Sequence, residues 1–280
     1  MAALRLIVHG DDFGLSEGVN DGIVRAHRDG ILTSASIIAP GEAFEHAVRL
    51  ARDTPGLDIG VHLTLVGEKP LSPVEKIPTL VGANGFLHPG AGVFVSRYLR
   101  GSLSISEIRS ELDAQIARVR ASGITVTHLD GHQHLHVLPG IRRIVGELAA
   151  HHGIRCIRHP METPRLYMLR EPGSLGRFLQ LLVLNAFCAA ARTGDAKHAA
   201  HFCGFFYGGR LAKENLARVL RHLPDAGTCE LMCHPGDGEP DSRYAAWGYD
   251  WSRECQALTD RTIGDYLRAR KIELISYANL

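Results

Sequence analysis

The chain has 280 residues, 45% of them hydrophobic, and a net charge of +1. This length and apolar content suffice for one large or two modest α/β domains, and the near-zero charge argues against a nucleic-acid-binding protein. The sixteen histidines point instead to metal binding or proton transfer, because imidazole is the commonest metal ligand and titrates near neutral pH.

The start of the chain carries an apolar run that is too short for a signal peptide, and Asp11 and Asp12 follow it directly. No later run predicts a transmembrane helix. The six cysteines are scattered and form no C-x-x-C pair, which is typical of reduced thiols. We therefore expect a cytoplasmic protein.

Strand and helix patterns alternate along most of the chain. In Leu57–Leu65 apolar side chains alternate with polar ones, as in a strand. S-I-S-E at 104–107 is a capping box that opens a helix. The predicted strands are Leu4–His9, Leu32–Ile38, Leu57–Leu65, Ile124–Leu129, Ile154–Arg158, Cys229–Cys233 and Ile272–Tyr277. The predicted helices follow Ser16, cover 43–51, run from 105 to Gly123, begin at Pro139, span Leu211–Leu223 and lie around 254–270.

This alternation predicts a parallel sheet with helical crossovers. About seven strands favour a distorted or incomplete (β/α) TIM-like barrel over an open wound sheet. No clean linker interrupts the sequence, so we expect a single domain over 1–280 with an apolar insertion or lid around 160–210. The run Phe178–Ala191 is typical of a buried helix, and the alternative is a lid or a membrane-surface contact.

Polar side chains follow most of the predicted strands. In parallel α/β folds the carboxyl ends of the strands meet at one rim, where active sites form. The residues at this rim are Asp11, Asp12, His62, Asp130, His132, His134, His136, Arg158, His159 and His234. One carboxylate and two imidazoles from different strands would suit a divalent metal with an open position for water. The sequence alone does not separate His132 from His134 as the ligand.

Each of these residues also has an ordinary structural alternative. Asp11 could cap the following helix. His62 could be a hydrogen-bonded interior histidine, and His134 could be structural or face a substrate. Arg158 could pair with a rim carboxylate or contact a sugar. His234 could only shape the turn before the proline that follows it.

Several motifs together resemble the YdjC-like carbohydrate deacetylases. They are H-G-D-D-F-G-L-S at 9–16, G-V-H-L-T-L at 60–65, T-H-L-D-G-H-Q-H-L-H at 127–136 and E-L-M-C-H-P-G-D at 230–237. G-I-L-T-S-A-S at 30–36 and G-E-K-P-L at 67–71 match as well, and the order is kept over nearly the whole chain. The hopanoid-biosynthesis branch of the family is the most similar.

The resemblance implies a TIM-barrel-like fold, one divalent metal ion (zinc or magnesium) and hydrolysis of an N-acetyl group on an amino sugar. Its motifs place the metal ligands at Asp12, His62 and His132. They place the general base at Asp11.

The chemistry of amide hydrolysis suggests the remaining roles. The leaving nitrogen needs a proton, for which His234 is the candidate acid. Asp130 would orient a ligand imidazole, and Arg158 and His134 are candidates for substrate binding. The resemblance to the hopanoid branch implies an N-acetylglucosaminyl hopanoid lipid as the substrate, with peripheral contact to the inner membrane surface. The alternatives are a soluble chitooligosaccharide deacetylase, a metal-dependent phosphoesterase, and a sugar- or metal-binding protein without a catalytic base and acid.

Overall fold

The computed structural model of the chain describes residues 3–171, 173–191, 196–238 and 243–280. Its strands form one sheet in the order β5-β4-β3-β2-β1-β7-β6, and β8 also pairs with β1. Every named pairing is parallel. The strands are β1 (Leu4–Phe13), β2 (Ser34–Ile37), β3 (Asp58–Leu63), β4 (Val126–Gly131), β5 (Cys156–Ile157), β6 (His201–Cys203), β7 (Gly227–Cys233) and β8 (Glu273–Ile275).

The sheet curls into a barrel that is not closed by a regular ladder. Between β5 and β6, the described residues form two isolated parallel bridges and no ladder, Cys156 with Lys197 and Glu162 with Phe202. The prediction of a distorted or incomplete (β/α) barrel is therefore confirmed. Because all strands run the same way, their carboxyl ends share one end of the barrel.

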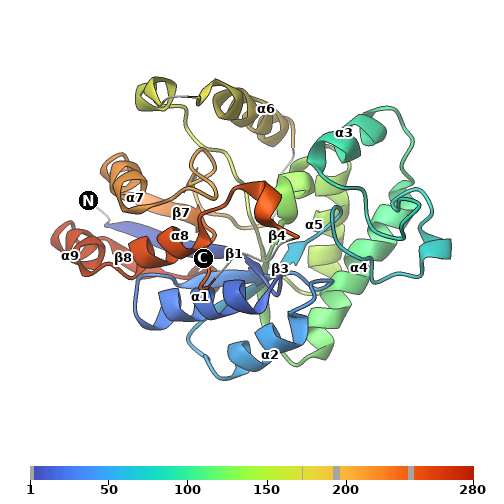
Figure 1. Ribbon diagram of the computed structural model, residues 1–280, viewed down its shortest axis with the longest axis horizontal. Helices are drawn as coiled ribbons and strands as arrows, with labels where there is room; N and C mark the ends of the chain where they lie inside the picture. Colours follow the sequence, from blue (N-terminus) through green and yellow to red (C-terminus); the bar gives the residue numbers. More distant parts are fainter. Residues whose placement is uncertain (1–2, 172, 192–195, 239–242) are drawn as a thin grey trace.

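Helices surround the strands (Figure 1). They bury apolar stripes against the sheet and against one another, and the common core draws on both layers. They are α1 (Glu17–Arg28), α2 (Phe44–Arg52), α3 (Ala91–Leu99), α4 (Ile105–Ala121), α5 (Ile141–His151), α6 (Leu175–Ala190), α7 (Lys213–Arg221), α8 (Trp251–Leu258) and α9 (Arg261–Ala269). The predicted cap is present on α4, where the Ser104 hydroxyl accepts the Glu107 N–H.

Four features differ from the sequence prediction. The first strand continues to Phe13 and carries the aspartate pair inside it, because its partner strand β2 extends the ladder. Helix α3, between β3 and α4, is absent from the predicted helices. The stretch 160–210, of which residues 172 and 192–195 lie outside the described part, contains the short strand β6, which was not predicted. The single helix expected around 254–270 is two helices, separated at Asp260, which caps α9.

Helix α1 packs unusually closely on the loop that follows β7. A Cβ atom on Gly22 would lie 2.2 Å from the Cα atom of Gly236. The N–H of Asp237 also donates to the carbonyl of Gly18 at 2.7 Å. This close approach fixes the loop that carries His234, so the glycine at position 22 serves the site as well as the core.

Replacing Gly22 with alanine should therefore destabilise the protein by about 1–3 kcal/mol, the usual cost of overpacking a tight contact. The matched control is Gly146→Ala in α5, where an added Cβ meets nothing within 4 Å. Alanine is the better helix former, so this control should gain up to about 1 kcal/mol. Thermal melting of both variants checks the difference, and equal melting temperatures would contradict the tight contact.

Candidate metal centre and active site

Three of the predicted side chains meet at the carboxyl end of the barrel. Asp12, His62 and His132 each offer one ligand atom, and these atoms all lie within 4.8 Å of one another. The Nδ1 atom of His132 lies 3.0 Å from Asp12 Oδ1, and the Nε2 atom of His62 lies 3.3 Å from the same oxygen. We call these three residues the triad.

The backbone is strained where it delivers the triad. The register of β1 against β2 shifts between Gly10 and Phe13, and Asp12 there has a φ of 69°. In the 3-10 turn His132–Val137, Gln133 and His134 have φ values of 51° and 56°. Left-handed backbone is unfavourable for residues with a Cβ and is characteristic of functional sites. The shift re-aims the Asp12 carboxylate toward the two imidazoles.

The donor set fits a divalent cation. Asp12 is 1% exposed, and its Oδ2 atom has no hydrogen-bond partner among the described residues. A buried carboxylate oxygen without a partner is costly unless a ligand satisfies it. Two imidazoles and one carboxylate are also a common zinc donor set. Their role as ligands stays a prediction, but their placement is what that role requires.

Asp130 holds His62 in the orientation that such a ligand needs. The His62 Nδ1–H donates to Asp130 Oδ1 at 2.9 Å, which leaves Nε2 directed at Asp12. The Ser36 hydroxyl donates to the other Asp130 oxygen at 2.9 Å. Burial by itself lowers the pKa of His62, but the charges of Asp130 and Asp11 outweigh burial and raise it to about 10. The site therefore strongly favours positive charge at this position.

Arg158 is the centre of a buried ion-pair cluster next to the triad. Its side chain is fully buried, and its Nε donates to Glu230 Oε1 at 2.7 Å. Its terminal nitrogens donate to Asp11 at 2.7 Å and 2.8 Å, and Nη1 forms an ion pair with Asp130 Oδ2 at 2.8 Å. Of the two alternatives for Arg158, pairing with a rim carboxylate is the one observed. Its predicted role in substrate binding stays a prediction, which these contacts do not favour because carboxylates occupy its donors.

The buried carboxylates around the triad also favour a bound cation. Asp11, Asp130 and Glu230 are buried and pair with the guanidinium of Arg158, whereas the buried Asp12 contacts the imidazoles of His62 and His132. Burial raises the pKa of Asp11, but Arg158 more than compensates and holds it well below its usual range. His9, Asp11 and Asp130 also come close enough to suggest a second metal group. Arg158 already supplies the positive charge there, so the triad is the better site.

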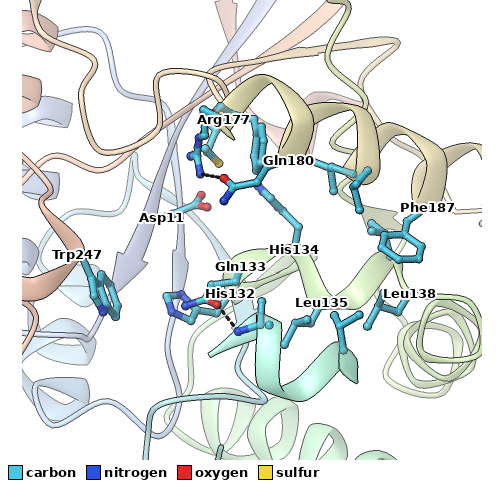
Figure 2. Close-up of a pocket in the computed structure, with 18 of the residues that line it drawn as sticks. Asp11, His132, Gln133, His134, Leu135, Leu138, Arg177, Gln180, Phe187 and Trp247 are labelled. Atoms are coloured by element: carbon cyan, nitrogen blue, oxygen red, sulfur yellow. Dashed lines mark hydrogen bonds between the residues drawn. The ribbon is translucent and has the colours of Figure 1, made fainter. Parts of the chain in front are cut away.

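A cavity of about 660 Å³ opens directly onto the triad. Asp11, His62, His132, His134 and His234 line its polar end (Figure 2). The predicted base and acid therefore both face the space beside the triad. The Nδ1 atom of His234 has no partner among the described residues, and its backbone N–H donates to the buried Glu254 at 2.6 Å.

Most of the remaining cavity wall is apolar, apart from Gln133, Arg177 and Gln180. Leu179, Val183, Leu184 and Phe187 of α6 form one side, and Phe205 closes it near His134. The run at 178–191 is core on one face and exposed on the other, because Leu181 and Cys188 are buried while Leu179 and Val183 are 54% and 55% exposed. A lid or a membrane contact stays a prediction for the exposed face.

Sequence reasoning missed several residues of this site. Ser36 ends the motif at 30–36, so its place at the end of a strand was a usable signal. Gln133 also lines the cavity, and its place between His132 and His134 in the motif at 127–136 was a further signal. Trp247 and Arg177 line the cavity as well, and no local pattern marks them. His136 lies in the same motif as His132, but it faces the interior, where its Nε2 bonds the Arg158 carbonyl.

Comparison with known proteins gives consistent matches over nearly the full chain. The family described as YdjC-like protein matches residues 5–269. A carbohydrate deacetylase of Brevibacillus brevis is 33% identical over 99% of this chain and 100% of its own length. A chitooligosaccharide deacetylase of Salmonella paratyphi B is 33% identical over 92% of both chains. A solved structure from Enterococcus faecalis, named as a candidate cellobiose-phosphate cleavage protein, has 25% identity, covers 99% of both chains and gives a TM-score of 0.77.

Metal analysis of purified variants tests the triad without any activity measurement. Each variant is dialysed first against zinc and then against zinc-free buffer. His62→Ala should then hold no zinc, whereas His134→Ala, a neighbour in the same cavity, should retain it. Asp130→Asn should weaken zinc affinity roughly 10- to 100-fold, because the outer partner of a ligand histidine raises its basicity. Full zinc occupancy in folded His62→Ala, or zinc loss in His134→Ala, would contradict this ligand set.

Proposed function

The chain belongs to the YdjC-like family, and we propose that it is a metal-dependent carbohydrate N-deacetylase. The observation that carries the proposal is the triad, with an unpartnered Asp12 oxygen, at the polar end of a cavity that also contains a carboxylate and an imidazole. Both relatives reported above are named as deacetylases. The whole chain would act as one domain, in which 160–210 supplies the apolar wall.

In this proposal Asp12, His62 and His132 hold the ion. When bound, a divalent ion supplies Lewis acidity and lowers the pKa of a water toward neutrality. The two imidazoles favour zinc over magnesium, which prefers oxygen ligands.

Asp11 and His234 would divide the proton transfers. Arg158 keeps Asp11 ionised, so its carboxylate can accept the proton of the attacking water at the cavity surface. His234 would donate a proton to the departing nitrogen, because an amide anion is too basic to leave. His134, whose Nδ1 has no described partner, is placed to contact the sugar. Burial lowers the pKa of His134, so it would act as a neutral group.

Asp11→Asn tests the base directly. The amide preserves shape but cannot accept the proton, so acetate release from an N-acetylglucosamine glycoside should fall by about 10²–10⁴-fold. Bound zinc should be unchanged, and thermal melting must show a folded protein because Arg158 loses part of an ion pair. A folded, zinc-loaded variant with near wild-type turnover would remove Asp11 from this role.

We further propose that the natural substrate carries an apolar, lipid-like group of the hopanoid type. Of the twelve exposed large hydrophobic side chains in the described part of the chain, seven lie between 161 and 183. They are Met161, Leu166, Leu169, Leu175, Leu179, Leu182 and Val183. Such clusters are characteristic of surfaces that meet a membrane or an apolar ligand. No helix among the described residues is long and apolar enough to cross a membrane.

This surface supports a peripheral site of action at the inner membrane, with the protein in the cytoplasm. The structure leaves all six cysteines as free thiols, which suits a reducing compartment. The alternative is a soluble chitooligosaccharide as substrate, which the Salmonella relative's name favours.

Two substitutions on α6 separate these substrates. Val183 lines the cavity, whereas Leu175 is exposed on the same helix but does not. Val183→Ser should reduce kcat/KM about fivefold for a monomeric octyl N-acetylglucosaminide, because roughly 1 kcal/mol of apolar contact is lost. It should spare the methyl glycoside, and Leu175→Ser should spare both. A wild-type protein that prefers chitobiose to the octyl glycoside would favour the soluble substrate instead.

A further inference from the structure

A cluster of aromatic side chains forms the cavity wall opposite α6. Trp247 lies in the short 3-10 helix η4 (Ala245–Trp247) and lines the cavity beside the triad. Figure 2 shows it on the far side of His132 from Leu138 and Phe187. Its ring centroid is 5.2 Å from that of His132, with the ring planes 34° apart. We call residues 244–250 the aromatic strap.

The aromatic strap is fixed at both ends. The hydroxyl of Tyr244 donates to Glu68 Oε1 at 2.8 Å, and Glu68 is 5% exposed. The N–H of Asp250 donates to the carbonyl of Gly209 at 2.8 Å. Glu68 belongs to the motif G-E-K-P-L, for which the proposed chemistry gives no role. Its carboxylate anchors the strap through Tyr244, so the position of Trp247 does not depend on a bound metal or substrate.

Packing within the aromatic strap fixes the indole as well. The ring of Trp247 lies 4.9 Å from Tyr244 and 5.6 Å from Tyr249, with interplanar angles of 57° and 65°. Trp251 lies 6.5 Å away beneath it and is 6% exposed. Trp247 itself is only half-buried. A large, rigid aromatic surface therefore borders the cavity beside the triad.

We propose that Trp247 is the platform on which the pyranose ring of the substrate stacks while its acetamide reaches the triad. The inference rests on the proposed deacetylase function and adds a sugar-positioning residue to it. One face of a pyranose carries axial C–H groups, which pack favourably on the electron-rich face of an indole. The sugar would then lie against Trp247, and the aglycone would extend along the apolar wall of α6.

This arrangement explains why the two walls differ in chemistry. Flexible aliphatic side chains on α6 accept many apolar shapes, whereas a fixed indole accepts a flat ring. Holding the ring restricts the acetamide to a few orientations, which lowers the entropic cost of reaching the transition state. Stacking should therefore contribute to both KM and kcat.

Tryptophan fluorescence tests the contact directly, because the chain contains only two tryptophans, Trp247 and Trp251. Stopped-flow mixing of zinc-loaded protein with methyl N-acetylglucosaminide should give a saturable fluorescence change before turnover. Trp251→Phe should keep this change and Trp247→Phe should lose it. A change that persists in Trp247→Phe, or its absence in wild-type protein that releases acetate, would overturn the proposal.

Steady-state kinetics provides a second test of the stacking role of Trp247. Trp247→Ala should raise KM for the methyl glycoside about tenfold, and Trp247→Phe should recover most of the loss because it restores an aromatic face. The loss should be about tenfold larger for the glycoside than for an acetamide without a sugar ring. If zinc content and melting temperature are unchanged in each variant, the loss does not arise from a disturbed His132.

The outcomes distinguish the two levels of inference. If wild-type protein releases acetate from no N-acetylated sugar, the proposed function fails. If it does release acetate and folded, zinc-loaded Trp247→Ala has the wild-type KM, only the stacking platform fails.

Discussion

One guanidinium makes the catalytic end of this barrel possible. Arg158 is fully buried and forms ion pairs with Asp11, Asp130 and Glu230 at once. Without it, three carboxylates would face one another in a medium that penalises isolated charge. With it, Asp11 and Asp130 stay ionised in fixed orientations, one at the cavity surface and the other behind His62. The carboxylate of Asp12 that remains would favour a cation at the triad.

The site is thus organised from the inside outward. The ion pairs fix Asp130, Asp130 fixes His62, and His62 faces the Asp12 carboxylate that the irregular end of β1 presents. Outside this polar centre the cavity has two unlike walls, the aliphatic face of α6 and the aromatic strap. A ligand that is polar at one end, flat in the middle and apolar at the other would match all three regions.

Much of this arrangement follows from the sequence. Alternating strand and helix patterns predict a parallel sheet. Asp12, His62 and His132 lie near the carboxyl ends of three strands, so such a sheet brings them to one rim although they are far apart in the sequence. Other features could not be predicted. β6 has three residues, too few for a periodic signal. An arginine at a strand end gives the same local pattern whether it binds substrate or pairs with carboxylates. Trp247 reaches the site through a tertiary contact that its neighbours in sequence do not encode.

The most direct measurement follows acetate release from an N-acetylglucosamine glycoside by the intact protein, before metal removal with a chelator, after it, and after zinc is returned. The account predicts that release stops with the metal removed and recovers in proportion to the zinc bound, up to one ion per chain. Undiminished release by metal-free protein would contradict the account, as would a zinc-saturated, folded protein that frees no acetate from any N-acetylated sugar.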